Sequence, residues 1–193
     1  MDSKEPEHTD EEIAVQVQLG NRKSFGILVK RYGIKMMRYA KKFLFGYEDA
    51  EDLVQEVFIK AYSNIQSFDT SRKFSSWLYR IAHNEFINAI KKKGKEHLPL
   101  LNLDTLFPHP VSGETADREI NIQESRQMLN KCLGKLDPKY REPLVLYYFE
   151  ELSYKEIADI LHIPTATVGI RLKRGKQIIK SFYEQQFKKI TIS

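Results

Sequence analysis

Cysteine is nearly absent from this chain of 193 residues, since Cys132 is the only one. A single cysteine excludes an internal disulfide and a metal cluster built on cysteines. The five histidines are scattered, and no two of them stand at metal-ligand spacing on one helix. The sequence therefore predicts neither a metal site nor a cofactor.

Long apolar runs are absent as well, and none approaches the roughly 20 residues that cross a bilayer. Residues 1–7 lack the basic and then apolar pattern of a secretory signal. Hydrophobic residues make up 41% of the chain and charged residues 30%, which is typical of a soluble globular protein. We expect a cytoplasmic protein without membrane insertion.

Alternating strand patterns are also missing, because almost every apolar stretch repeats at helical spacing. The expected fold class is all-α, with two small helical domains joined by a flexible linker and a helix-turn-helix in the second domain. The expected divisions are an acidic tail at 1–9, a first domain at 10–94, a linker at 95–121 and a second domain at 122–193.

Four helices are expected in the first domain. Asp10 is expected to cap the first, whose inward side chains would be Ile13, Val17 and Leu19, and Gly20 to end it. The next three are expected from Asn21 to Gly46, from Glu48 to about Ser63, and from Trp77 to Lys93.

The linker combines helix-breaking residues (Pro99, Pro108, Pro110 and Gly113) with several leucines. A segment this apolar could lie in a groove of a partner or pack against its own domains, and the sequence leaves both open. In the second domain, Asp137 and Pro138 form a helix start signal, Pro143 is expected to kink that helix, and Cys132 is expected in the core.

A helix-turn-helix unit follows. Ser153 and Glu156 form a capping box, His162 to Pro164 form a turn, and Thr165 is expected to cap a second helix. Small polar residues and arginine at the start of such a helix can meet base edges, and later cations can meet phosphates. The candidate residues for duplex DNA are Ser153, Thr165, Thr167, Ile170, Arg171, Lys173, Arg174 and Lys176. An ordinary helical hairpin with a solvated basic face is the alternative.

Charge is unevenly distributed. The net charge is +5 and the pI near 9.1, with basic residues concentrated at Lys91–Lys95 and from Arg171 to Lys180. Two separate basic stretches indicate two contacts with a polyanion, or else two solvated helix faces.

The helix after Glu48 has an acidic face opposite its apolar stripe, formed by Asp49, Glu51, Asp52, Gln55 and Glu56. Such a face suits a basic protein partner better than DNA, although it could also serve solubility alone.

The loop from Ser67 to Trp77 has aromatic residues at both ends, and the next helix carries a polar stripe. Aromatic rings, amides and cations together suit single-stranded DNA, although Trp77 by itself fits a core position better. The candidate residues for this contact are Phe68, Asp69, Phe74, Trp77, Arg80, Asn84, Asn88 and Lys91.

Four motifs resemble a known family. The segments Gly20–Phe25, Asp49–Phe58, Phe74–Asn84 and Leu152–Ala158 are similar, in the same order, to extracytoplasmic-function (ECF) sigma factors of the sigma-70 family. The resemblance implies that the helix from Asp49 to Tyr62 docks on the coiled coil of the polymerase beta-prime subunit, with the beta subunit as a further partner.

The same resemblance implies that the loop from Phe68 to Phe74, with Asn84, holds an extruded base of the minus-ten promoter element. The second domain would read the minus-thirty-five element, and an anti-sigma factor would be a partner. Three positions depart from the family pattern: His162 replaces a usual glycine, and Gly169 and Ile170 replace a basic and a small polar residue.

Two other functions are compatible with parts of the sequence. The helix-turn-helix alone would allow a stand-alone transcriptional regulator, but the first half lacks the strand–helix alternation that seats a phosphoacceptor aspartate. A nuclease would need more than the exposed neighbours Glu51, Asp52 and Glu56. We therefore expect a protein that is not an enzyme.

Overall fold

The computed structural model describes residues 8–44, 49–96 and 128–190, and side chains beyond 92 only from 128 to 184. Throughout these ranges the chain forms helices, short turns and loops, with no strand. The expected all-helical, two-domain fold is confirmed. Most of the expected linker lies outside the described residues.

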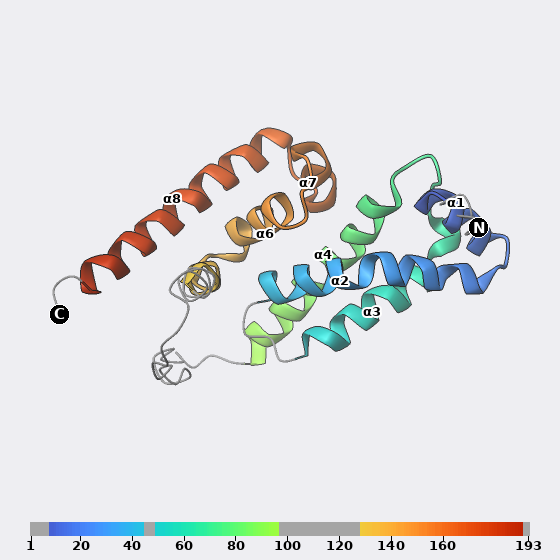
Figure 1. Ribbon diagram of the computed structural model, residues 1–193, viewed down its shortest axis with the longest axis horizontal. Helices are drawn as coiled ribbons and strands as arrows, with labels where there is room; N and C mark the ends of the chain where they lie inside the picture. The colour runs from blue at the N-terminus through green and yellow to red at the C-terminus, as the bar shows by residue number, and fades with distance from the viewer. Residues whose placement is uncertain (1–7, 45–48, 97–127, 191–193) are drawn as a thin grey trace, which may run out of the picture.

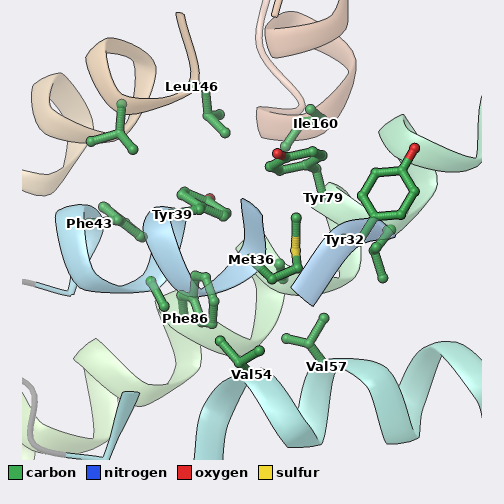
Figure 2. Close-up of a cluster of buried hydrophobic side chains, with 14 of the residues drawn as sticks. Tyr32, Met36, Tyr39, Phe43, Val54, Val57, Tyr79, Phe86, Leu146 and Ile160 are labelled. Atoms are coloured by element: carbon green, nitrogen blue, oxygen red, sulfur yellow. The ribbon is translucent and has the colours of Figure 1, made fainter. Parts of the chain in front are cut away.

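The first domain consists of α1 (Asp10–Gln18), α2 (Phe25–Phe43), α3 (Ala50–Ser63) and α4 (Phe74–Glu96), with 3-10 turns at Arg22–Ser24 and Ile65–Ser67. Figure 1 shows α2 and α3 side by side, and both also contact α4. The apolar stripe of α2 faces this centre, and Figure 2 shows Met36, Tyr39 and Phe43 beside Phe86 of α4 and Val54 of α3.

The first helix begins differently from the sequence prediction. Thr9, not Asp10, is its cap, and forms a capping box with Glu12. Asp10 instead accepts hydrogen bonds from Arg31 and Tyr32 of α2. Leu19, expected to face inward, is 83% exposed because the helix ends at Gln18 and Gly20 turns the chain at φ 100°.

The second domain contains a helical segment at 128–135, then α6 (Pro138–Tyr148), α7 (Tyr154–Leu161) and α8 (Thr165–Ile190). Asp137 caps α6 as expected, accepting from the backbone N–H of Lys139. Cys132 is buried in the core, also as expected. The helix α6 continues through Pro143.

The helix-turn-helix forms as the sequence indicates. Ser153 and Glu156 make the capping box at the start of α7, and His162 ends that helix in the left-handed conformation. Thr165 is the first residue of α8 rather than its cap, since the carbonyl of Pro164 accepts the first backbone hydrogen bonds. Gly175 allows α8 to approach α6 closely, because a Cβ atom there would lie 2.8 Å from the Leu144 side chain.

The two domains pack against each other. The helix α6 contacts α2 and α7 contacts α4, and buried side chains of both domains form one continuous cluster. In Figure 2, Leu146 and Ile160 of the second domain lie beside Tyr39 and Tyr79 of the first.

Candidate polymerase and DNA interfaces

The acidic face of α3 is open to solvent. Its buried side is formed by Ala50, Val54, Val57 and Ala61. The opposite face carries Asp49, Glu51, Asp52 and Gln55, all exposed, with the half-buried Glu56. Within the described residues only Glu56 of these carboxylates has an ion-pair partner, Lys60 at 3.8 Å. The remaining charges are therefore available to a cationic partner.

The loop between α3 and α4 is held in place by α1. The Gln18 side chain donates to the carbonyl oxygens of Ile65 and Phe68, at 2.8 and 2.9 Å. The Glu11 carboxylate accepts the backbone N–H of Phe74 at 2.9 Å, and so satisfies a free amide at the start of α4. Neither residue was a sequence candidate, because each acts on a segment more than 45 residues away.

Asp69 organises the tip of this loop. Its carboxylate accepts from the hydroxyl and backbone N–H of Ser71, and Arg72 lies 3.4 Å away. The hydrogen bond from the Ser71 hydroxyl is the main cause that lowers the pKa of Asp69. Asp69 therefore stabilises the turn at the tip of the loop through hydrogen bonds with a residue of the same loop.

Phe68 and Phe74 do not present free rings for base stacking. Phe68 is 4% exposed and Phe74 fully buried, and both pack against each other and against the half-buried Trp77. The prediction that these two phenylalanines contact DNA is corrected: their rings are apolar enough to be drawn into the core, where they support the loop.

The polar stripe of α4 lies on the surface as expected. Asn84, Asn88 and Lys91 are exposed and Arg80 is half-buried. Beside Asn84 is a hollow of about 270 Å³, slightly smaller than the roughly 300–1,000 Å³ of ligand sites. Its lining residues are Lys60, Asn64, Ser67, Trp77, Ile81, Asn84 and Glu85.

The sequence prediction named only Trp77 and Asn84 among these lining residues. The hollow lies against the end of α3 and the following turn, rather than inside the loop from Phe68 to Phe74. Lys60 and Glu85 form an ion pair at 2.6 Å along its edge. Because these two residues are 25 positions apart and lie on different helices, no helical periodicity in the sequence predicts that they form an ion pair.

The recognition surface of the second domain is also solvent-facing. Thr165, Ile170, Lys173, Arg174 and Lys176 are exposed on α8, and Ser153 is exposed at the start of α7. Thr167 and Arg171 are half-buried. Within the described part of the chain none of the cations on this surface has an ion-pair partner. They are free to meet phosphates.

A groove of about 960 Å³ lies between the two candidate DNA surfaces. One wall is the loop and α4, including Arg72, Lys73 and Arg80, and the other is the start of α7, including Ser153 and Asp159. Lys73 Nζ donates to Glu156 at 2.7 Å across it. Burial acts to raise the pKa of Glu156, but the hydrogen bonds from Lys73 and Ser153 outweigh it and lower that pKa to about 2.

An acidic helix, a polar hollow and a helix-turn-helix therefore occur in one helical chain. Comparison with known proteins confirms the resemblance to sigma factors that the sequence motifs indicate. The family described as Sigma-70 region 2 matches residues 28–96, and the family described as Sigma-70, region 4 matches residues 126–179. The ECF RNA polymerase sigma factor SigW of Bacillus subtilis (strain 168) is 38% identical over 179 residues, covering 86% of this chain and 91% of that protein. The chain belongs to the ECF group of the sigma-70 family.

Similarity to other family members also spans both domains. The ECF RNA polymerase sigma-E factor of Escherichia coli (strain K12) is 33% identical over 178 residues, covering 89% of this chain and 92% of that protein. The solved structure of CnrH in complex with the cytosolic domain of CnrY matches with a TM-score of 0.69 and 26% identity, over 92% of this chain and 99% of CnrH.

The family regions coincide with the surfaces already described. Region 2 of this sigma-70 family member contains the acidic face of α3 and the polar stripe of α4, and region 4 contains the helix-turn-helix. Among the described helices, none is both long and apolar enough to span a membrane.

Proposed function

We propose that this protein is an RNA polymerase sigma factor of ECF type, which binds core polymerase, directs it to specific promoters and helps to open the DNA. The observation that carries the proposal is the presence, in one chain, of an acidic face on α3 and a helix-turn-helix with a basic surface. Among the described residues, Asp49, Glu51 and Asp52 on the first surface and the cations on the second have no ion-pair partner. The first suits a cationic protein surface and the second suits duplex DNA.

The partners follow from these surfaces. Asp49, Glu51, Asp52, Gln55 and Glu56 dock on the coiled coil of the beta-prime subunit, and the beta subunit is a further contact. The start of α8 reads the minus-thirty-five element in the major groove, and its later cations meet phosphates. The protein acts in the cytoplasm, where its polymerase is.

The minus-ten element is met by the first domain as a melted strand. The hollow beside Asn84 takes an extruded base, whose edge can hydrogen-bond with the exposed amide of that residue. Arg80, Asn88 and Lys91 lie along the same side of α4 and follow the strand. Capture of an unpaired base favours the open duplex without any bond being made, so the protein needs no catalytic residue.

Neither domain needs to bind promoter DNA strongly by itself. Once polymerase holds both at a set separation, the second DNA contact becomes intramolecular, and effective concentration replaces free concentration. We assign residues 10–94 to the domain for polymerase and minus-ten DNA, and 122–193 to the domain for minus-thirty-five DNA, with a tail at 1–9 and a linker at 95–121.

An anti-sigma factor is a further proposed partner. The solved structure of CnrH, which shares the fold over both domains, is a complex with the cytosolic domain of CnrY. A solved sigma factor RpoE is likewise in complex with the anti-sigma factor NepR from Bartonella quintana. An inhibitor that covers the acidic face or the DNA surfaces would keep this chain from polymerase.

Run-off transcription on a promoter library tests the proposal. Purified core polymerase should produce discrete transcripts only when this protein is added. Tight binding of the free protein to one specific duplex, with no transcripts from the mixture, would instead support a stand-alone transcriptional regulator.

A further inference from the structure

The outward face of the recognition helix is apolar near its start. Val168, Leu172 and Gly175 form the buried side of α8. Ile170 lies two residues after Val168, roughly 200° around the helix at about 100° per residue, and therefore points away from the core of the domain. Its side chain is 53% exposed. The second turn of α8 thus carries a large aliphatic side chain at the point farthest from the rest of the domain.

Ala166 continues this apolar line one turn earlier. It stands four residues before Ile170, on the same side of the helix, and is also exposed. Neither side chain has an atom that donates or accepts a hydrogen bond. When a recognition helix enters a major groove, the residues near its start meet the base edges. These two residues therefore cannot read the donors and acceptors of a base pair, and only an apolar group on a base can contact them favourably.

An aromatic ring flanks the same region. A Cβ atom on Gly169 would lie 3.6 Å from Cε2 of Tyr154, so this ring packs beside the residue that precedes Ile170. Tyr147 contacts the ring edge-on, with 5.3 Å between the two ring centroids, and Tyr154 is 40% exposed. Because Gly169 has no side chain, the neighbour of Ile170 on this side of α8 is an aromatic ring rather than a cation.

Cations border the apolar line further along the helix. Lys173 and Arg174 stand three and four residues after Ile170, one on each side of the line, and both are exposed. Neither has an ion-pair partner among the described residues. Their charges suit the phosphates that border a groove, whereas an apolar protein partner would leave both charges without a counter-charge. The charge pattern therefore favours duplex DNA as the occupant of this face.

We infer that Ile170, together with Ala166, sets the sequence preference of the minus-thirty-five contact by packing against the C5-methyl group of a thymine. This methyl is the apolar group that base pairs present in the major groove, and apolar side chains contact it there. The thymine readout rests on the proposed function, which supplies the promoter duplex, and adds to it the base that is read. Ile170 departs from the small polar residue of the family pattern, so the thymine readout is a property of this chain.

Replacing thymine by deoxyuridine tests the thymine readout, because uracil keeps every hydrogen-bonding group of thymine and lacks only the methyl. The minus-thirty-five element is first selected from a randomised promoter library by run-off transcription with core polymerase and the wild-type protein. Each thymine of the selected element is then replaced singly by deoxyuridine, and the affinity of the holoenzyme for each duplex is measured by fluorescence anisotropy.

The test variant is Ile170→Ser, which removes the aliphatic side chain from an exposed position and leaves the core of the domain intact. Ile34→Ser is the matched control, since it makes the same change at an isoleucine that is 79% exposed on α2. Ile170→Val is the conservative variant, because valine keeps most of the apolar surface.

The wild-type holoenzyme should bind about fourfold more weakly when deoxyuridine replaces the thymine that Ile170 contacts, because the burial of one methyl group is lost. Ile170→Ser should bind the thymine and deoxyuridine duplexes equally at that position. Ile34→Ser should keep the full wild-type difference, and Ile170→Val should keep most of it.

Three results would overturn the thymine readout: a selected element without thymine, no effect of deoxyuridine at any thymine, or an effect that persists in Ile170→Ser. If transcripts form normally in these cases, the sigma function stands and only the role of Ile170 is refuted. The absence of transcripts from every promoter would refute the sigma function and the thymine readout together, so the two failures are distinguishable.

Discussion

His162 has a backbone conformation that is unfavourable for a residue with a side chain. It ends α7 at φ 53° and ψ 46°, a left-handed conformation that glycine adopts more readily. His162→Gly should therefore raise the free energy of unfolding by about 0.5–1 kcal/mol, even though glycine has more freedom in the unfolded chain. Urea unfolding followed by circular dichroism measures the change.

Gly20 is the matched comparison, because replacing this glycine should change the free energy of unfolding in the opposite direction. It turns the chain at φ 100°, and no atom lies within 4 Å of the place that a Cβ atom would take, so only backbone strain opposes alanine there. Gly20→Ala should lower the free energy of unfolding by about 1 kcal/mol. For the His162 prediction, a His162→Gly variant that is less stable than the wild type would be the contradicting result, and it would show that the imidazole makes an interaction that offsets the backbone strain.

Asn84 and Arg171 should affect different steps of initiation. Asn84→Ala removes the amide beside the hollow and should reduce open-complex formation about tenfold or more, with little effect on initial docking. Arg171→Ala should weaken recognition of the minus-thirty-five duplex by about 1–3 kcal/mol. Permanganate footprinting reports opening, and a gel shift of the holoenzyme reports docking. Normal opening with Asn84→Ala would refute the base pocket.

Helix α1 acts as a brace for the loop before α4. Glu11 accepts the first backbone N–H of α4, and such a cap contributes about 0.5–2 kcal/mol. Glu11→Ala should therefore lower stability by about 1 kcal/mol and weaken binding of single-stranded DNA, because the loop loses its support. Amide hydrogen exchange at Phe74 measures the local effect. Glu12→Gln, which keeps a capping side chain at the start of α1, is the control and should leave that amide protected.

The carboxylate of Glu156, on α7, should make the free energy of unfolding depend on pH. The pKa of Glu156 in the folded protein is about 2, below its ordinary value of 4.5. The ionised carboxylate therefore stabilises the fold above pH 5, and this contribution is lost as pH falls from about 5 to 2. Urea unfolding at pH 6 and pH 3 should show a smaller acid loss for Glu156→Gln than for the wild type. Equal losses would contradict the assignment.

Local signals in the sequence predicted the helices well. The capping box of Ser153 and Glu156, the Asp137–Pro138 start and the apolar stripes each act within a few residues, and the structure confirms the helix-turn-helix that they indicate. The predicted helix boundary was wrong where a distant side chain determines it. The helix α4 begins at Phe74 rather than Trp77, because the carboxylate of Glu11, on α1, accepts a hydrogen bond from the backbone N–H of Phe74. Phe68 and Phe74 were misplaced for a similar reason, since burial depends on neighbours that the loop sequence does not reveal.

The arrangement of the whole molecule could not be predicted from local patterns. Arg38 and Glu150 are 112 residues apart, and neither has a periodic signal that points to the other. The two domains were therefore expected as separate units, whereas the structure joins their cores. Charge on the surface was more predictable, because the acidic face of α3 follows directly from helical spacing.

Binding of core polymerase tests the proposed sigma function most directly. Because Asp52 and Glu56 lie on the acidic face of α3, Asp52→Lys with Glu56→Lys should weaken binding at least about tenfold, and the wild-type affinity should fall as salt rises. Glu184→Lys, on α8, should bind like the wild type. Surface plasmon resonance with immobilised core enzyme measures all three proteins. Core enzyme that fails to bind the wild type, or that binds the double reversal equally well, would contradict the account.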